Sequence, residues 1–100
     1  MKMTNEMIAN GAEKYIKVFE QIEKMAQTDG SKDSALKLIR EVYPNYGWNG
    51  LNYLLFVLQK CGRIEGLTIE GTQVMEPIMP KLTETCLAEI EARKTVFVSA

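Results

Sequence analysis

The chain has 100 residues, 46% of them hydrophobic and 25% charged, and its 12 basic and 13 acidic side chains leave a net charge of −1. This length and composition predict one globular domain covering residues 1–100, with a core that needs no disulfide or metal. The nearly neutral charge excludes the general attraction to nucleic acid or anionic membranes that strongly basic proteins have.

Residues 4–28 are predicted to form the first helix, because apolar side chains recur there at alternating spacings of four and three residues. The members of this stripe are Ile8, Ala12, Tyr15, Phe19, Ile22 and Ala26. Such a stripe is typical of a helix face that packs on a core, and it is also typical of the seam of a coiled coil. The sequence therefore leaves open whether the stripe belongs to the core or joins two copies in a homodimer.

The second helix is predicted over residues 33–43, with Ser31 or Asp33 as its N-terminal cap and Pro44 as its stop. The turn after it is aromatic, with four flat amphipathic side chains: Tyr43, Tyr46, Trp48 and the nearby Tyr53. These side chains either cover one end of the core or form an exposed patch, since Tyr and Trp are favoured at the centres of binding surfaces. The second interpretation makes the turn a candidate partner-binding site.

A third helix is predicted over residues 50–61, with the sequence GLNYLLFVLQKC. It is apolar on almost all sides, and a helix of that kind is expected to be buried. The chain from 63 to 71 is predicted to be an extended connection. The sequence leaves open whether this connection contains one or two very short strands or a small hairpin.

The chain is predicted to become helical again after that connection, with a last helix that begins at Met79 or Pro80 and ends at about Arg93. Residues 96–98 are then either a short closing strand or a tail that docks through its apolar side chains. The predicted fold class is all-α or nearly so: a single compact domain of four to five helices around a buried central helix at about 50–61.

Much catalytic chemistry is missing from the chain. It has no histidine, which removes the commonest general base and the commonest metal ligand, and it has no glycine-rich phosphate loop. Cys61 and Cys86 are too few for a zinc cluster and are expected to be buried thiols. Glu65 and Glu70 are candidates for paired catalytic carboxylates, but we interpret them as solvated loop charges. We therefore expect no enzyme activity, no catalytic residue, no metal and no cofactor.

The longest apolar run, from Tyr53 to Leu58, is too short to cross a bilayer, and no signal peptide is recognisable before the body of the chain. Two cysteines are also fewer than a disulfide-rich secreted domain usually carries. We therefore expect a cytoplasmic protein that has no membrane partner.

Charge is distributed unevenly along the chain. Residues 31–63 carry five basic and two acidic side chains, whereas residues 64–92 carry six glutamates and one lysine. Carboxylates in such a segment can bind the arginine and lysine side chains of a partner, as a phosphate backbone would. Together with the aromatic turn, this segment supplies the candidate partner-binding residues: Tyr46, Trp48, Glu65, Glu70, Glu76 and Glu84.

Residues 51–82 resemble the second half of a winged helix-turn-helix domain, as in the MarR-like and HxlR-like bacterial regulators. Leu58 to Ile64 is similar to the Leu-x-x-x-Gly-x-Ile motif at the end of the recognition helix. Leu67 to Gly71 is similar to the Leu-Thr-x-x-Gly motif that closes the wing and opens the next helix. The inward face of that next helix is matched by Val74-Met75 and by Ile78-Met79-Pro80.

Only Glu65 and Gly66 lie between the two motifs, so the resemblance implies a winged helix whose wing is lost. A recognition helix presents polar and basic groups to DNA bases, whereas the helix at 50–61 is mainly apolar and is followed by an acidic segment. The resemblance therefore implies a module that binds protein and makes no direct contact with nucleic acid.

By size and character alone, the chain also resembles small phage-encoded inhibitors, among them anti-CRISPR proteins, which act by occupying a surface of a host complex. The leading prediction is a non-catalytic protein-binding module, a stoichiometric inhibitor of phage type that blocks a nucleic-acid-binding surface of a host nucleoprotein complex. The alternative is a DNA-binding transcriptional regulator of degenerate winged-helix type.

Overall fold

The computed structural model describes residues 5–99 and, among them, the side chains of residues 13–94. Within these residues the chain has four helices: α1 (Asn5–Met25), α2 (Lys32–Ile39), α3 (Trp48–Lys60) and α4 (Glu84–Ser99). Between α3 and α4 lie four strands of two residues each: β1 (Ile64–Glu65), β2 (Ile69–Glu70), β3 (Gln73–Val74) and β4 (Lys81–Leu82). The strands form two antiparallel pairs, β1 with β4 and β2 with β3.

The prediction of an all-α fold is wrong, because residues 64–82 form these paired strands and the structure is mixed α and β. We call this segment the β arm. It folds back on itself, with Ile64 opposite Leu82 at its base and Ile69 opposite Val74 near its tip. Branched side chains favour strands, and the two prolines of the arm oppose a continuous helix. The helical segment expected after residue 71 is therefore absent between β2 and the start of α4.

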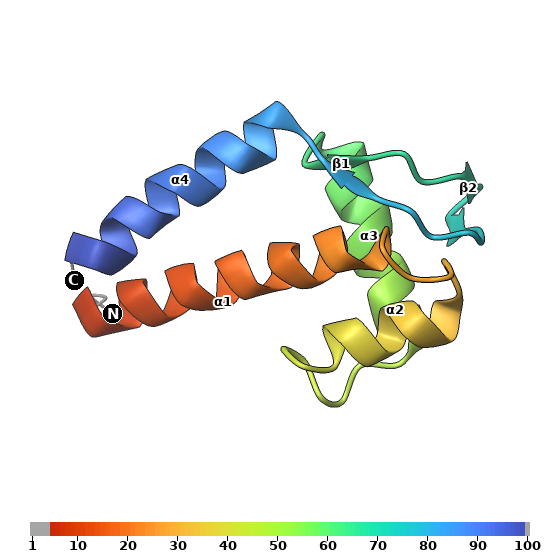
Figure 1. Cartoon of the computed structure of the whole chain (residues 1–100), viewed down its shortest axis with the longest axis horizontal. Helices are drawn as coiled ribbons and strands as arrows, with labels where there is room; N and C mark the ends of the chain where they lie inside the picture. The colour runs from red at the N-terminus through yellow and green to blue at the C-terminus, as the bar shows by residue number, and fades with distance from the viewer. Residues whose placement is uncertain (1–4, 100) are drawn as a thin grey trace.

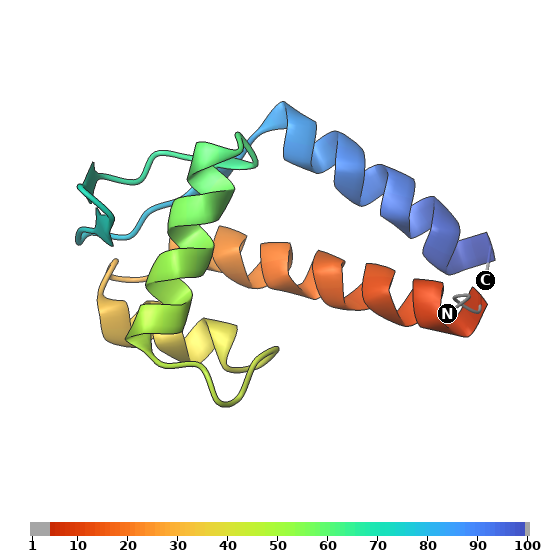
Figure 2. The same ribbon diagram turned by 180° about the vertical axis from the view of Figure 1, so that it is seen from behind.

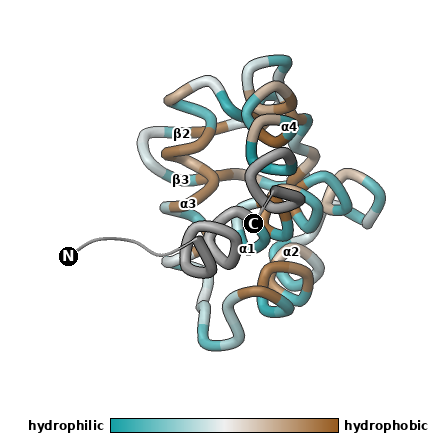
Figure 3. Tube along the Cα trace, turned by 90° about the vertical axis from the view of Figure 1, so that its left-hand side faces the viewer, coloured by the Kyte–Doolittle hydropathy of each residue, from teal (hydrophilic) through white to brown (hydrophobic). Residues whose placement is uncertain are grey.

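Helix α1 is the scaffold of a small compact domain. Figure 1 shows α4 running back along α1 in the opposite direction, so that the start of α1 and the end of α4 lie together, while α3 crosses the far end of α1. Both α2 and α4 contact α1, and α3 contacts α2, β1 and β3. Figure 3, seen from the end where the termini lie, places α1 between α2 and α4.

The core lies where α1, α3 and the β arm meet, and every helix contributes to it. Its fully buried side chains are Phe19, Ile22, Met25, Ile39, Leu51, Leu55, Ile64, Val74, Ile78 and Cys86. Burying one such side chain stabilises a fold by about 1.5–3 kcal/mol. In the described part of the α1 stripe, Phe19 and Ile22 belong to this core, Tyr15 is half-buried and Ala26 is exposed. The stripe members Ile8 and Ala12 lie outside the described side chains.

The first three helices are present where they were predicted, with ends that differ from the prediction by one to four residues. Ser31 is the cap of α2, because its side-chain oxygen accepts the backbone N–H of Ser34 at 3.1 Å. Helix α2 ends at Ile39, four residues before the predicted end, and the chain continues in turns to Pro44. Helix α3 begins at Trp48, two residues before the predicted start.

The last helix differs most from its prediction. It begins at Glu84, where the side-chain oxygen of Thr83 accepts the N–H of Cys86 at 3.3 Å and so caps the first turn. It continues to Ser99, so the first alternative for 96–98, a closing strand, is wrong. The second alternative, a tail docked through its apolar side chains, falls on side chains outside the described ones.

Two amide side chains of α3 hold the β arm in place. Asn52, which is only 8% exposed, donates to the carbonyl of Thr72 at 2.9 Å and accepts the N–H of Val74 at 2.7 Å. Gln59, two turns further along, makes the same pair of bonds with the carbonyl and N–H of Leu67, at 3.0 and 2.9 Å. Buried backbone groups must be hydrogen-bonded, so these two amides satisfy groups that the short strands leave unpaired.

Candidate functional site

The largest exposed apolar surface of α3 lies on the side that faces away from the core. It consists of five residues one or two turns apart, which we call the outer face of α3: Asn49, Tyr53, Phe56, Val57 and Lys60. Tyr53 is 69% exposed and Val57 37% exposed. The prediction that this helix is buried on all sides is therefore wrong, since its buried residues are Leu51, Asn52 and Leu55.

The outer face stays open because the other sides of α3 are occupied. Leu51 and Leu55 point into the core, and Asn52 and Gln59 hold the β arm on one flank. On the opposite flank, the ring of Tyr46 packs against Gly50. Figure 2 shows α3 in front of the other elements, with the β arm on one side of it and α2 below. A partner can therefore approach the outer face along the whole length of the helix.

The outer face ends at a hollow between the last turn of α3 and the β arm. This open hollow has a volume of about 430 Å³ and is lined by Gln59, Lys60, Leu67, Ile69 and Gly71. Its lining combines the amide and ammonium groups of α3 with the aliphatic side chains at the tip of the arm. A partner on the outer face would reach both elements.

Most aromatic rings in the described part of the chain already have a cation over them. Four pairs lie within 6 Å: Lys14 over Tyr43, Lys32 over Trp48, Lys60 over Phe56 and Arg93 over Tyr15. Among residues 13–94, Phe19 is buried and Tyr46 stacks on Tyr43, with ring centres 4.7 Å apart. Tyr53 is the remaining ring, and it has neither a cation nor a stacked ring in this part of the chain. Its face is free to receive a group from a partner.

The two aromatic residues predicted to bind a partner lie in the turn before α3 and are half-buried. Tyr46 is stacked, and its carbonyl accepts a 2.8 Å hydrogen bond from Arg40. Trp48 packs against the core, and its indole N–H is buried without a hydrogen-bond partner in the described structure. The sequence left open whether these rings cover the core or form an interface, and the structure places them at the edge of the core.

The four glutamates predicted to bind a partner are all exposed, but they lie on different elements. Glu65 and Glu70 stand on β1 and β2, and Glu84 is the first residue of α4. Glu76 has a structural contact, because its carboxylate accepts the N–H of Lys32 at 2.7 Å at the start of α2. An anionic group there is favourable for the helix dipole, and it ties the β arm to α2.

The sequence predicted only part of the outer face of α3 as a candidate binding surface. The sequence groups Tyr53 with the aromatic side chains of the turn, which it offers as a candidate binding site. It places Phe56, Val57 and Lys60 in a helix that is predicted to be buried. The spacing of Asn49, Tyr53 and Val57 at intervals of four residues places them on one side of a helix. In a helix that is apolar all round, however, this spacing does not indicate which side faces water.

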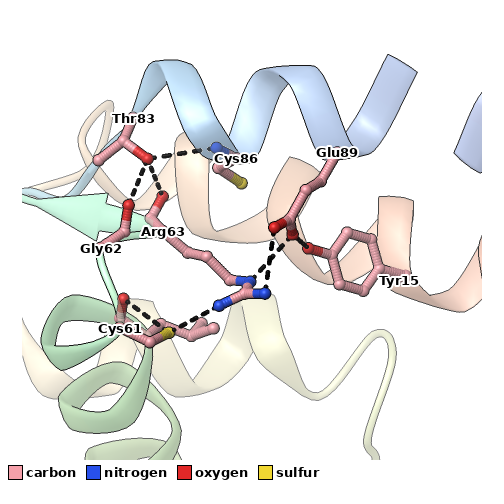
Figure 4. A network of polar contacts seen from close by, with 8 residues as sticks. Tyr15, Cys61, Gly62, Arg63, Thr83, Cys86 and Glu89 are labelled. Carbon is pink, nitrogen blue, oxygen red and sulfur yellow. Dashed lines mark hydrogen bonds and ion pairs between the residues drawn. The ribbon is translucent and has the colours of Figure 1, made fainter. Parts of the chain in front are cut away.

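A polar network joins the end of α3 to α4 and α1 (Figure 4). The guanidinium of Arg63 donates to both oxygens of the Glu89 carboxylate, at 3.0 and 3.1 Å, and to the sulfur of Cys61 at 3.1 Å. The hydroxyl of Tyr15 donates to the same carboxylate at 2.6 Å. In the turn between α3 and β1, the carbonyl of Gly62 accepts a 2.6 Å hydrogen bond from the hydroxyl of Thr83. A bidentate pair of this kind fixes orientation as well as distance, so the network positions the base of the β arm.

The same network shifts the pKa values of Glu89 and Tyr15, and it includes the exposed thiol of Cys61. Hydrogen bonds from Tyr15 and Arg63 lower the pKa of Glu89, whereas burial and the Glu89 carboxylate raise the pKa of Tyr15. The prediction that both cysteines are buried is wrong for Cys61, which is exposed beside Arg63, while Cys86 is buried. Both thiols are free.

The lowered pKa of Glu89 predicts a pH-dependent stability. The unfolded chain has the ordinary carboxyl pKa, so the contribution of Glu89 is complete above that value and is lost as the pH falls through the lower native pKa. Urea unfolding of the wild type and of Glu89→Gln at about pH 7 and about pH 3 checks this. We expect a larger stability difference between the two proteins at the higher pH. An equal difference at both pH values would show that the carboxylate charge has no such effect.

The candidate site described above consists of surface contacts. Across the described residues there is no group of three or more His, Cys, Asp or Glu side chains that could hold a metal ion. The described helices also include none with the length and hydrophobicity required to cross a membrane. No protein-family model, curated protein or solved structure matches the chain. The proposals that follow therefore depend on the geometry and chemistry of the surface.

Proposed function

We propose that this protein is a non-catalytic protein-binding module that docks through the outer face of α3. The observation that carries the proposal is the exposure of Tyr53 and Val57, at 69% and 37%, on a helix whose opposite side is the core of the domain. Tyrosine supplies a large amphipathic contact at a small entropic cost and is enriched among the residues that dominate binding energy. Fixed by the core and by the β arm, the helix presents these side chains without rearrangement.

The charges around this face support a basic partner. Glu65 and Glu70 on the β arm are exposed, and neither makes an ion pair within residues 13–94. Glu70 lies between two residues that line the hollow at the end of the outer face, whereas Glu65 lies opposite Lys81 in the β1–β4 pair. A partner surface with an apolar centre and arginine or lysine side chains at its edge would complement both the outer face and these carboxylates. A cation of the partner could also lie over the free ring of Tyr53. Nucleic-acid-binding surfaces have this chemistry, so we propose that the protein is a stoichiometric inhibitor that covers such a surface in a host nucleoprotein complex.

Capture from bacterial lysate tests this proposal with variants of α3 and of the β arm. Tyr53→Ala should weaken capture of the partner by about 30-fold, as expected for the loss of a dominant contact, and Val57→Asp should weaken it further. Glu70→Lys should weaken it most at low salt, because the contribution of that carboxylate is electrostatic. Glu20→Lys makes the same charge change at an exposed position of α1 and serves as the matched control.

The captured partner must also lose nucleic-acid binding when the protein is added in equal amounts. Partner capture that is the same for the wild type, Tyr53→Ala and Val57→Asp would contradict the outer face as the binding surface. Capture that depends on Tyr53 but leaves nucleic-acid binding by the partner intact would support a protein-binding module and contradict the inhibitor.

A DNA-binding regulator is the second candidate, and the order of the elements favours it. Helices α2 and α3 are followed by the paired strands β1 and β4, and the β arm lies where a wing follows a recognition helix. No helix follows Leu67-Thr68 directly. Leu82-Thr83, in contrast, lies at the end of the β arm and is followed directly by α4. The second Leu-Thr pair therefore occupies the position that the winged-helix resemblance assigned to the first.

The charges of these elements favour the protein partner over DNA. The outer face of α3 has one cation, Lys60, and the β arm has three carboxylates and one lysine. Phosphate contacts by lysine and arginine supply most of the affinity of DNA-binding proteins. A gel shift with double-stranded DNA at low salt decides between the two. Binding that falls steeply with salt and is weakened in Lys60→Ala would establish the regulator and contradict the protein-binding proposal.

A further inference from the structure

A second exposed apolar feature lies on the other side of the domain. An open hollow of about 510 Å³ separates the last turns of α1 from β4 and the first turns of α4. Ala26, Met79, Leu82 and Leu87 are among the apolar side chains that line it. Leu87 is 47% exposed, and among the described residues the other exposed large apolar side chains are Tyr53 and Val57 of α3. We call this feature the Leu87 hollow.

The charges at the rim of the Leu87 hollow are of opposite sign. Glu23 of α1 and Lys81 of β4 both line it, and both are exposed. Neither makes an ion pair within the part of the chain whose side chains are described. The patch therefore combines one exposed leucine, one hollow, an anion at Glu23 and a cation at Lys81, which lies opposite Glu65 in the β1–β4 pair.

The patch carries both the leucine and the hollow, and both the anion and the cation. It can therefore pair with an identical patch on a second copy. In a two-fold dimer each subunit presents the same surface, so residue i of one copy meets residue j of the other and the reverse. We propose that the Leu87 hollow binds a second copy of this chain. Leu87 of each subunit enters the hollow of its partner, and Glu23 of each subunit pairs with Lys81 of the other across the two-fold axis. A basic or acidic partner would leave one of the two rim charges opposed by a like charge.

This dimer leaves the outer face of α3 free. In Figure 1 the chain leading through β4 into α4 passes in front of α3, whereas in Figure 2 α3 lies in front of that chain. The backbones of β4 and of α3 therefore lie on opposite sides of the domain, and the two surfaces share no residue. The proposed dimer presents two copies of the outer face and does not depend on the protein-binding proposal.

Sedimentation of the full-length chain between about 1 µM and about 500 µM tests the inference. We expect a monomer–dimer equilibrium for the wild type. Leu87→Asp should weaken dimerisation by more than tenfold, because it places a carboxylate in the apolar hollow. Glu23→Lys and Lys81→Glu should each weaken it by about tenfold, since each replaces two attractive pairs with two repulsive ones.

The combined variant Glu23→Lys/Lys81→Glu is the decisive measurement, because it exchanges the charges and restores both pairs. We expect its dimerisation to return to within about threefold of the wild type. Val57→Asp introduces a similar change on the outer face of α3 and should leave dimerisation unaltered. A wild type that is monomeric throughout the concentration range, or a combined variant no better than the single ones, would overturn the inference. Circular dichroism melting curves show whether each variant is folded.

Discussion

Replacing Leu55 by alanine should lower the free energy of unfolding by about 2–5 kcal/mol, which is a large part of the stability of a domain this small. Leu55 is 0% exposed and lies at the centre of the inner side of α3, where the helix meets the core. Its removal takes away apolar burial and leaves a cavity that the packed neighbours cannot fill completely. Urea unfolding followed by circular dichroism measures the effect.

Val57→Ala is the matched control for this prediction, because it shortens an apolar side chain on the opposite side of the same helix. Val57 is 37% exposed, so we expect a loss of about 0.5 kcal/mol or less. Equal losses for the two variants would contradict the assignment of inner and outer sides of α3. The comparison therefore tests the orientation on which the proposed binding surface depends.

Replacing Gly30 by alanine should destabilise the protein more than the same change at Gly62. Both glycines have a φ of +79°, in the left-handed region that costs other residues about 1–2 kcal/mol. At Gly30 the added methyl carbon would also lie 2.7 Å from the side chain of Pro77, whereas at Gly62 nothing lies within 4 Å. We expect a loss of about 1 kcal/mol for Gly62→Ala and at least about 2 kcal/mol more for Gly30→Ala.

The reason for the larger effect is the contact between the loop before α2 and the β arm. The carbonyl of Gly30 accepts the N–H of Ile78 at 2.7 Å, and a methyl group at Gly30 would push the two backbones apart. Thermal unfolding of both variants, with the wild type as reference, measures the difference. Losses of similar size at the two positions would indicate that backbone conformation alone sets the cost and that the loop and arm are not held closely.

The exposed surfaces suggest how one small domain could assemble and bind at the same time. The outer face of α3 and the Leu87 hollow are built on different residues. The network of Arg63, Glu89 and Tyr15 joins the elements that carry them, because it connects the end of α3 to α4 and α1. A dimer formed through the hollow would give each complex two binding faces and so increase its avidity for a partner with repeated sites.

The candidate site was less predictable than the fold. The glutamates of the β arm and of α4 are exposed, as loop and helix-start positions suggest, but their partner remains a proposal. Tyr46 and Trp48 lie at the edge of the core, and the exposed ring is Tyr53. The exposure of a side chain on an apolar helix depends on which neighbours pack against it, and those neighbours lie far away in the chain.

The sequence by itself determined where the first three helices lie, to within four residues at each end. A helix is held by hydrogen bonds between residues four apart, so its signals are local, as in the apolar stripe of α1 and the choice of Ser31 or Asp33 as the cap of α2. Only the tertiary structure decided the β arm and the exposed side of α3. The partner of Ile64 is Leu82, and the amides that satisfy the arm come from Asn52 and Gln59 on α3. Those bonds join residues that lie far apart in the sequence. A strand of two residues depends on such distant partners, and its own local sequence pattern is too weak to predict it.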